Sequence, residues 1–208
     1  MTRLDALPDA GQEGYARILE SLSKERQERI AKNKNLESKK QLLGAGALLQ
    51  KVLDIYGLDA NTIYKDSHGK PMLEGIHFNL THTDGLVLCA VGNQPVGCDA
   101  ELIKKAPRGI AERFFCTGEK NVLHKSELMY DDVFYRLWTM KESYIKMTGE
   151  GMSLPMDAFE IQLSEPIKVF RNGVEQSCYI KEYEVLGYKV AVCSEEKEFS
   201  EQIVVLNE

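Results

Sequence analysis

The sequence predicts an α+β fold built from two similar halves, each a long helix packed on a small antiparallel sheet, with a cleft between them. Residues 37–57 and 134–148 carry apolar side chains at the spacing of an amphipathic helix. Each helix is followed by short apolar segments between turn-forming residues, which is typical of antiparallel strands. Two of these segments, DGLVLCAVG at 84–92 and LGYKVAVCS at 186–194, resemble each other. This internal repeat is the third indication of a two-part fold.

The first half, residues 1–102, is predicted to start with helices. Residues 15–35 have a helical pattern, and the long helix that follows them ends at Gly57, a typical C-cap. Gly44 and Gly46 lie inside that helix, where glycine lowers helix stability, so we expect a neighbour packed closely against them. Strands are predicted over residues 62–65, 77–81, 86–91 and 96–102.

The second half, residues 103–208, is predicted to repeat this order. Two short helical patterns occur within residues 104–131 and precede the helix at 134–148. A tail that is first charged and then apolar, residues 195–208, follows the last strand. Strands are predicted over residues 158–163, 177–186 and 188–194.

The helix at 134–148 places one lysine, Lys141, inside its apolar stripe. At about 100° per residue, Glu142 lies at the edge of the stripe and Lys146 follows one turn later. Thr139 and Ser143 are expected to face away from the core. Either Lys141 extends past the core edge and Glu142 pairs with Lys146, or these three charges gather where the helix meets another layer. The second interpretation predicts part of a functional site.

A pair of carboxylates lies in the strand PVGCDAEL, residues 95–102. Asp99 and Glu101 share one face of the strand because side chains alternate, while Cys98 and Ala100 point to the other face and can pack. Two carboxylates at this spacing repel each other and raise each other's pKa unless a cation lies between them. They are either a solvated pair on an edge strand or half of a site for a divalent cation, which prefers oxygen ligands.

If the two halves face each other, Glu142 can complete a site begun by Asp99 and Glu101. Three carboxylates suit Mg²⁺, which keeps several waters and binds substrate phosphates directly. Lys141 and Lys146 would then meet phosphate charge, a combination typical of phosphoryl-group chemistry. The sequence contains no P-loop or other glycine-rich nucleotide motif, so the phosphates must be held in another way.

Composition argues against several classes of protein. The net charge of -6 and the pI of about 5.4 provide no basic field for nucleic acid or membrane lipid. The opening segment MTRLDALPDAGQEG lacks the apolar core of a signal peptide, and no apolar run is long enough to span a membrane. Five widely spaced cysteines without a CxxC pair indicate reduced thiols in the cytoplasm.

The two charged segments occur together in a known pattern. GxDxE at residues 97–101, followed by WxxKESxxK at residues 138–146, resembles the paired motif of the 4′-phosphopantetheinyl transferases, in particular the long, monomeric, surfactin-synthetase-activating kind. The resemblance runs from residue 20 to residue 194. Further similar stretches are HGKP (68–71), FNLTH (78–82), RFF (113–115) and GEGMSLP (149–155).

This resemblance implies two pseudo-symmetric α+β halves that bind coenzyme A, as a substrate, in the cleft between them. It implies transfer of the 4′-phosphopantetheine arm onto a serine of an apo acyl or peptidyl carrier protein, with release of adenosine 3′,5′-bisphosphate. By the motif match, Asp99, Glu101 and Glu142 correspond to ligands of Mg²⁺, with Mn²⁺ as an alternative. Lys146 corresponds to a diphosphate contact that stabilises charge on the leaving phosphate.

Two residues have open assignments in this resemblance. Glu119 matches a family glutamate that is assigned as the base for the carrier serine, but a metal-bound water or Asp99 could take that role. Glu119 is otherwise a first-turn helix carboxylate that interacts with the helix dipole. Lys141 belongs to the matching block and would either hold phosphate or orient the nucleophile.

Five residues of the first half match positions that hold coenzyme A. Lys70 and the Thr81-His82 pair match the lining of the adenine and 3′-phosphate pocket. Thr81 stands where serine is usual, and the hydroxyl is kept. Arg26 and Arg29 match basic residues near the 3′-phosphate; the alternative is a solvated charged face of a helix.

The resemblance makes an acidic, helical carrier protein the expected partner. Residues 103–116 combine basic side chains with Phe114 and Phe115, which suits such a partner through charge steering and apolar contact. The alternative is a solvated loop with both phenylalanines in the core. The basic residues are Lys104, Lys105, Arg108 and Arg113.

Two other functions compete with the transferase. One is a non-catalytic module of the same fold that binds coenzyme A or a carrier, and the presence of all three acidic residues and Lys146 argues against it. The other is a different Mg²⁺-dependent phosphotransfer enzyme, which would bind nucleotides without preference for a 3′-phosphate.

Overall fold

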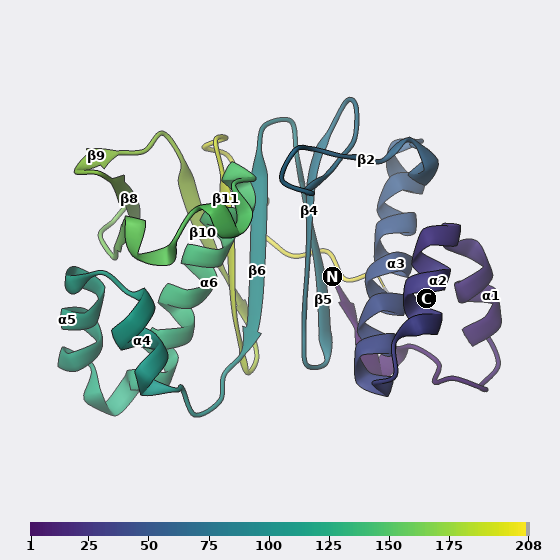
Figure 1. Cartoon of the computed structure of the whole chain (residues 1–208), viewed down its shortest axis with the longest axis horizontal. Coiled ribbons are helices and arrows are strands. Elements are labelled where there is room, and N and C mark those ends of the chain that lie inside the picture. The colour runs from purple at the N-terminus through teal and green to yellow at the C-terminus, as the bar shows by residue number, and fades with distance from the viewer. Residues whose placement is uncertain (207–208) are drawn as a thin grey trace.

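The computed structural model describes residues 1–206 and shows two α+β halves side by side (Figure 1). Helix α3 (Leu36–Tyr56) packs on the sheet of the first half, and helix α6 (Tyr130–Thr148) packs on the sheet of the second. Strands of the two sheets contact each other between these helices. The layer order is therefore helix, sheet, sheet, helix, which confirms the predicted α+β class. Residues 207–208 of the predicted second half lie outside the described residues.

The helical region predicted over residues 15–35 consists of two short helices, and Ser23 is the N-cap residue of the second. The break lies at Leu22, whose backbone is extended and whose side chain is buried among residues of α3. Gly57 ends α3 in the left-handed conformation, with φ of 67°, as predicted. The sheet has the order β1-β5-β4. The other elements are β1 (Thr2–Arg3), α1 (Tyr15–Ser21), α2 (Lys24–Lys32), β2 (Tyr64–Lys65), β3 (Pro71–Met72), β4 (His77–Thr83) and β5 (Leu86–Gly92).

The second half contains the two predicted short helices and the predicted strands, with two further strands. Strands β8 and β9 follow β7 in a small separate sheet. Both are short and carry charged residues, so the sequence shows no strand pattern there. The elements are β6 (Val96–Leu102), α4 (Arg108–Phe114), α5 (Thr117–Lys125), β7 (Phe159–Gln162), β8 (Lys168–Arg171), β9 (Val174–Glu175), β10 (Tyr179–Val185) and β11 (Tyr188–Ser194).

Strand β6 connects the two halves. In sequence it closes the predicted first half, but it pairs antiparallel with β11 and completes the sheet β10-β11-β6. It also contacts β4 of the first sheet, where the backbone N–H of Cys98 donates to Asn79 Oδ1 at 2.9 Å. Backbone pairing thus divides the chain between β5 and β6, while the boundary at residue 102 stays a prediction.

Helix α6 is covered on more than one side. Thr139 and Ser143, which were expected to face away from the core, are only 1% and 0% exposed, so that expectation was wrong. The reason is that β6 lies directly against this side of the helix. A Cβ atom on Gly97 would overlap the backbone oxygen of Ser143 and the backbone nitrogen of Met147. A residue without a side chain is therefore required where β6 crosses α6.

The glycines inside α3 also serve close packing, as predicted. A Cβ on Gly46 would lie 2.6 Å from Cδ of Arg26 and 2.7 Å from Cδ1 of Leu22. A Cβ on Gly44 would lie 2.6 Å from Cδ2 of Leu4. These gaps let α2 and the N-terminal segment approach the axis of α3, and they set the position of Arg26.

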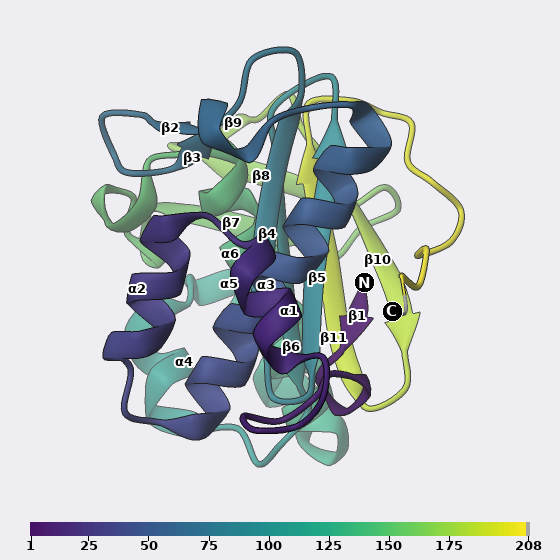
Figure 2. The same cartoon turned by 90° about the vertical axis from the view of Figure 1, so that its right-hand side faces the viewer.

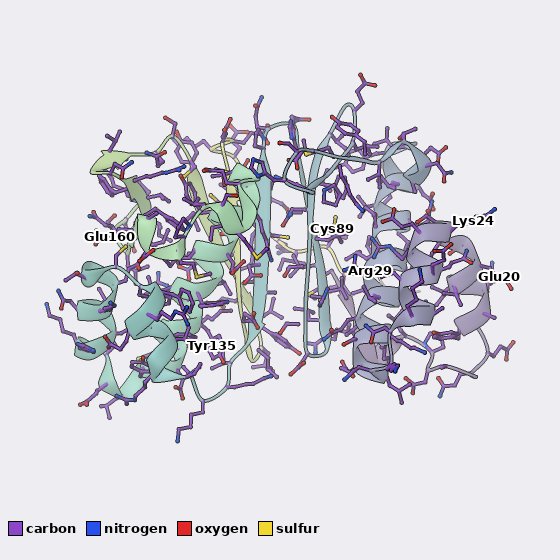
Figure 3. The ribbon with its side chains drawn as sticks, in the orientation of Figure 1. Glu20, Lys24, Arg29, Cys89, Tyr135 and Glu160 are labelled. Atoms are coloured by element: carbon purple, nitrogen blue, oxygen red, sulfur yellow. The ribbon has the colours of Figure 1, made fainter. Side chains whose placement is uncertain are left out.

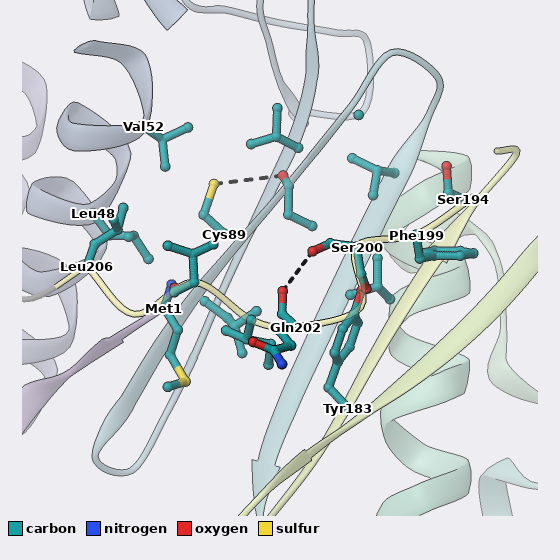
Figure 4. Close-up of a pocket in the computed structure, with 18 of the residues that line it drawn as sticks. Met1, Leu48, Val52, Cys89, Tyr183, Ser194, Phe199, Ser200, Gln202 and Leu206 are labelled. Atoms are coloured by element: carbon teal, nitrogen blue, oxygen red, sulfur yellow. Dashed lines mark hydrogen bonds between the residues drawn. The ribbon is translucent and has the colours of Figure 1, made fainter. Parts of the chain in front are cut away.

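The segment after β11, residues 195–206, runs from the second half back to the first and ends beside the N-terminus (Figure 2). The backbone N–H of Leu206 donates to the carbonyl of Met1 at 2.9 Å, and the Tyr183 hydroxyl donates to the carbonyl of Ser200 at 2.9 Å. A mostly apolar cavity of about 360 Å³ lies beside this segment (Figure 4). The segment is therefore a second connection between the halves, besides the contact of β4 with β6.

Replacing Gly97 by alanine tests the approach of β6 to α6. Because the added methyl group would meet backbone atoms that cannot rotate away, we expect Gly97→Ala to lower the free energy of unfolding by roughly 3 kcal/mol or to prevent folding. Gly109→Ala in α4 is the matched control, since its Cβ meets nothing within 4 Å, and it should leave stability unchanged or slightly raised. Equal denaturant midpoints for the two variants would contradict the close approach.

Candidate active site

Asp99 lies at the point where the two halves meet. This residue of β6 is 4% exposed. Its Oδ1 accepts hydrogen bonds from Lys146 Nζ at 2.6 Å and from Thr81 Oγ1 at 3.0 Å. Lys146 belongs to α6 and Thr81 belongs to β4, so one carboxylate joins three elements. The structure thus brings together the two predicted motif segments and one of the predicted coenzyme A residues.

Matching alternation on two strands explains how these side chains meet. Thr81 and Thr83 share one face of β4, and Asp99 and Glu101 share one face of β6. Thr83 Oγ1 donates to Glu101 Oε2 at 3.1 Å, which repeats the Thr81–Asp99 contact two residues further along. The opposite face of β6 is apolar, as predicted: Cys98 is fully buried, and burial raises its pKa to about 11.

Glu142 lies one turn before Lys146 on α6 and is half-buried. Burial raises the pKa of Glu142, and the negative charge of Asp99 raises it further. The same two causes raise the pKa of Glu101, although its contact with Thr83 opposes them. Asp99 is therefore close enough to act on both Glu101 and Glu142, and folding concentrates negative charge around it.

One oxygen of this cluster has an unusual environment. Asp99 Oδ2 is buried and has no hydrogen-bond partner, which is rare for a buried carboxylate oxygen and is compatible with a cation ligand. Within residues 1–206, however, no three or more histidine, cysteine, aspartate or glutamate side chains form a group that could hold a metal ion as they stand. The donor types suit a hard divalent cation. The predicted metal-ligand set of Asp99, Glu101 and Glu142 therefore stays a prediction.

Basic side chains of the first half lie near this cluster. His82 follows Thr81 on β4, and partial burial of its ring lowers its pKa. The positive charges of Lys146, Arg29 and Arg26 lower the pKa of His82 further, so these cations lie on the same side of the molecule. Arg26 and Arg29 also line a cavity of about 440 Å³ between α2 and α3, and Figure 3 marks Arg29.

A larger cavity of about 690 Å³ opens between the halves. From the second half it is lined by Trp138, Glu142 and Lys146 of α6, and from the first half by Asn79 and Lys70. These residues supply an aromatic ring, a carboxylate and two ammonium groups, and the lining also includes Phe114, Arg113 and Asp157. Such a cavity is within the usual size range for a small-molecule site.

Lys70 lines this cavity, but its ammonium group contacts backbone. Lys70 Nζ donates to the carbonyls of Lys146 at 2.7 Å, Met147 at 3.1 Å and Val96 at 3.4 Å. The last carbonyls of a helix lack partners within the helix, which explains why a lysine from the other half caps α6 here. The predicted contact of Lys70 with coenzyme A stays a prediction.

Two predicted site residues, Glu119 and Lys141, do not face the cavity between the halves. Their side chains are fully buried, and Lys141 Nζ donates to Glu119 Oε1 at 2.6 Å. The stripe of α6 that contains Lys141 faces α5 and β7, because the cleft lies along a different side of the helix. Neither side chain lines the cavity, and the roles of Glu119 as a base and of Lys141 as a phosphate ligand stay predictions.

Sequence reasoning missed Thr83 and Asn79, which contact Glu101 and the backbone of Cys98. Asn79, Thr81 and Thr83 alternate along FNLTHT, so a period-two pattern of polar residues was the available signal. The pattern alone does not say which strand they face.

Comparisons with known proteins agree with this arrangement. A family model described as "4'-phosphopantetheinyl transferase superfamily" matches residues 95–193, which contain both motif segments. The 4'-phosphopantetheinyl transferase Sfp of Bacillus subtilis (strain 168) is 35% identical over 206 residues, which is 94% of this chain and 92% of that protein. The chain belongs to the 4′-phosphopantetheinyl transferase superfamily.

The comparisons also found a second transferase and a solved structure. The 4'-phosphopantetheinyl transferase gsp of Aneurinibacillus migulanus is 34% identical over 84% of this chain and 76% of its own. A solved structure, the holo-[acyl-carrier-protein] synthase of Thermotoga maritima, aligns with 48% of this chain and 61% of its own at a TM-score of 0.41 and 17% identity.

The crowding of carboxylates predicts a gain in stability when one of them loses its charge. A carboxyl group with a raised folded-state pKa binds its proton more tightly in the folded protein, so the free energy of unfolding falls as pH rises through that pKa. Glu142→Gln has no charge to bury, so it avoids this loss of free energy of unfolding. It should raise Tm at pH 7 by a few degrees, at about 2–4 °C for each kcal/mol gained in the free energy of unfolding.

Thermal unfolding between pH 4 and pH 8 measures this effect. At pH 4, where the carboxyl is protonated in the folded state, the difference between Glu142→Gln and the wild type should shrink. Glu127→Gln, at an exposed position, is the control and should not change Tm. An unchanged or lower Tm for Glu142→Gln at pH 7 would show that the charge of Glu142 is not destabilising.

Proposed function

We propose that this protein transfers the 4′-phosphopantetheine group of coenzyme A to a serine of an apo carrier protein and releases adenosine 3′,5′-bisphosphate. The observation that carries the proposal is the contact of Asp99 with Lys146 and Thr81, which joins both motif segments beside a cavity between the halves. Membership of the superfamily supports the same reaction.

In this reaction the serine oxygen forms a bond to the phosphorus that bears the pantetheine arm. The bond from that phosphorus to the oxygen of the adenosine phosphate breaks, and negative charge develops on the leaving phosphate. Lys146 suits this charge. Burial opposes the charge on Lys146, but the carboxylates of Asp99 and Glu142 outweigh that effect and raise its pKa, so it stays protonated. A fixed ammonium group in a partly desolvated cleft stabilises such charge strongly.

The serine proton needs an acceptor in the cleft. Glu142 lines the cavity, and while no cation is bound burial raises its pKa, so that it then accepts a proton more readily than an ordinary carboxylate. If Glu142 holds a cation, a water on that ion or Asp99 would be the acceptor instead. Glu119 is fully enclosed and is less well placed for this step.

Phosphates of coenzyme A would find their counter-charges on the first half. Arg26 and Arg29 line the cavity between α2 and α3, and the charges of both act on His82. Coenzyme A carries a diphosphate and a separate 3′-phosphate, and each of them would need its own cations. Lys146 suits the diphosphate, and Arg26 and Arg29 suit the 3′-phosphate.

Mg²⁺, with Mn²⁺ as an alternative, would be held by Asp99, Glu101 and Glu142. The buried Asp99 Oδ2 has no hydrogen-bond partner, and a divalent cation would relieve the repulsion of Asp99 with Glu101 and with Glu142. When bound, the ion would neutralise charge on the diphosphate.

The partner would be an acidic carrier that docks beside the cavity. Phe114 lines the cavity, and the guanidinium of Arg113 lies 5.0 Å from the centre of its ring. Phe115 is in the core, and Lys104 is paired with Asp84, so the rim predicted from residues 103–116 is narrower than expected. Beside the cavity, Arg113 provides charge and Phe114 provides an apolar contact, and the exposed Lys105 and Arg108 add positive charge to the same segment.

We also retain the predictions of a monomer that acts in the cytoplasm and does not bind nucleic acid or membranes. All five cysteines are free thiols, which suits a reducing compartment. None of the helices among the described residues 1–206 is long and apolar enough to cross a bilayer.

Mass spectrometry of apo carrier proteins tests the proposal directly. Incubation with this protein, coenzyme A and Mg²⁺ should add one phosphopantetheine to a serine. Lys146→Met should reduce the initial rate at least about 100-fold, the usual effect of losing a group that stabilises transition-state charge. Lys125→Met, at an exposed position on α5, is the control and should keep the wild-type rate.

Three results would contradict the proposal. Folded protein that modifies none of several acyl and peptidyl carriers would argue against a transferase, and carrier binding without transfer would identify a binding module. Equal rates with coenzyme A and with dephospho-coenzyme A would argue against a role for the 3′-phosphate.

A further inference from the structure

The carboxylate of Glu119 connects three elements of the second half. Its Oε2 accepts from the backbone N–H of Cys116, which precedes α5, at 2.8 Å. Its Oε1 accepts from the backbone N–H of Ile161 in β7 at 2.7 Å and from Lys141 Nζ of α6 at 2.6 Å. Both oxygens are therefore occupied by donors of the protein, and the side chain is 0% exposed.

The ammonium group of Lys141 is equally enclosed. Besides Glu119, it donates to the carbonyl of Phe159 at 2.7 Å. The same Nζ lies 4.3 Å from the centre of the Phe159 ring and 5.8 Å from that of Phe115, distances at which an aromatic ring attracts a cation. The side chain is 0% exposed, so no ligand reaches it without displacing the core.

The position of this pair on α6 links it to the cleft. Lys141 directly precedes Glu142, and Lys146 follows five residues later. At about 100° per residue these side chains point in different directions from the same helix. Glu142 and Lys146 line the cavity between the halves, whereas Lys141 holds the helix to α5 and β7. A rotation of α6 that broke the pair would move both cleft residues.

We propose that Glu119 and Lys141 are positioning residues, which form an internal ion pair that fixes the rotation of α6 and so aims Glu142 and Lys146 into the cleft. Glu119 is then neither the base for the carrier serine nor a group that contacts substrate. Lys141 is not a phosphate ligand. The measurements of kcat and KM rest on the proposed transferase function. The measurements of Tm and of coenzyme A binding test the inference without enzyme activity.

Removing only the lysine should lower the stability of the protein strongly, and removing both charges should lower it much less. Lys141→Met leaves a buried carboxylate without its cation, which is strongly destabilising. Glu119→Gln in the same chain removes that charge, and its amide oxygen still accepts one of the two backbone N–H groups that Glu119 binds, while the other loses its acceptor. The double variant should therefore recover much of what Lys141→Met loses, because buried ion pairs can often be replaced by neutral groups.

The experiment compares wild type, Glu119→Gln, Lys141→Met and the double variant in Tm, in the dissociation constant of coenzyme A by calorimetry, and in kcat and KM at a temperature well below every Tm. Lys141→Met should lower Tm by roughly 6–20 °C. While folded, it should lower kcat about 10- to 100-fold and weaken coenzyme A binding, because both cleft residues are displaced. The double variant should recover most of the Tm and come within about fivefold of wild-type kcat.

An exposed ion pair of the same half is the control. Lys168 and Glu175 lie 2.9 Å apart on β8 and β9, and Lys168→Met with Glu175→Gln should change neither Tm nor kcat appreciably.

Two outcomes would overturn the inference. A folded double variant and a folded Glu119→Gln that both lose at least about 100-fold in kcat, with unchanged coenzyme A binding, would identify Glu119 as the base. Folded Lys141→Met with wild-type kcat and coenzyme A binding would show that the pair positions nothing. If Lys141→Met does not fold, the double variant takes its place. The inference then predicts that the double variant folds and comes within about fivefold of wild-type kcat, and a double variant that also fails to fold would contradict it. A wild type without transfer activity would contradict the proposed function alone, since Tm and binding still report on the pair.

Discussion

The close contact of β6 with α6 at Gly97 is the constraint on which the rest of the site depends. A side chain at this position would overlap the backbone of α6, and its absence lets the strand cross the helix directly. Two residues further along β6, Asp99 reaches Lys146 of α6 and Thr81 of β4. One backbone approach therefore brings the carboxylate of Asp99 to an ammonium group that is 47 residues away in the chain.

Three lysines around α6 illustrate how burial determines the role of the same side chain. Lys141 is enclosed and holds the helix to its neighbours, Lys146 is partly exposed and faces the cleft, and Lys70 caps the end of the helix from the other half. The charge of the three side chains is the same, and their different partners determine whether the ammonium group is enclosed, caps a helix or lines the cleft. The carboxylates follow the same rule, since Glu119 has all its partners within the protein and Asp99 has one oxygen without any.

The sequence was sufficient for the fold class, the long helices and the strand that carries Asp99 and Glu101, because these depend on local periodicity and turn residues. It did not reveal that β6 pairs with β11, since that contact joins residues some ninety positions apart and leaves no local pattern. A helical wheel placed Lys141 inside the apolar stripe correctly, but it could not show that this stripe faces α5 and β7 instead of the cleft. The alternative interpretation of Glu119 was a carboxylate in the first turn of a helix. The structure agrees with it in part, since Glu119 accepts a hydrogen bond from the Cys116 backbone N–H at the start of α5.

The most direct test of the account is a double-mutant cycle on Asp99 and Lys146, measured by denaturant unfolding of wild type, Asp99→Asn, Lys146→Met and the double variant. If the carboxylate and the ammonium group meet across the crossing of β6 and α6, the two changes should be coupled by about 1–3 kcal/mol. Effects that add within about 0.5 kcal/mol would show that the two groups do not interact, and the site built on their contact would be wrong.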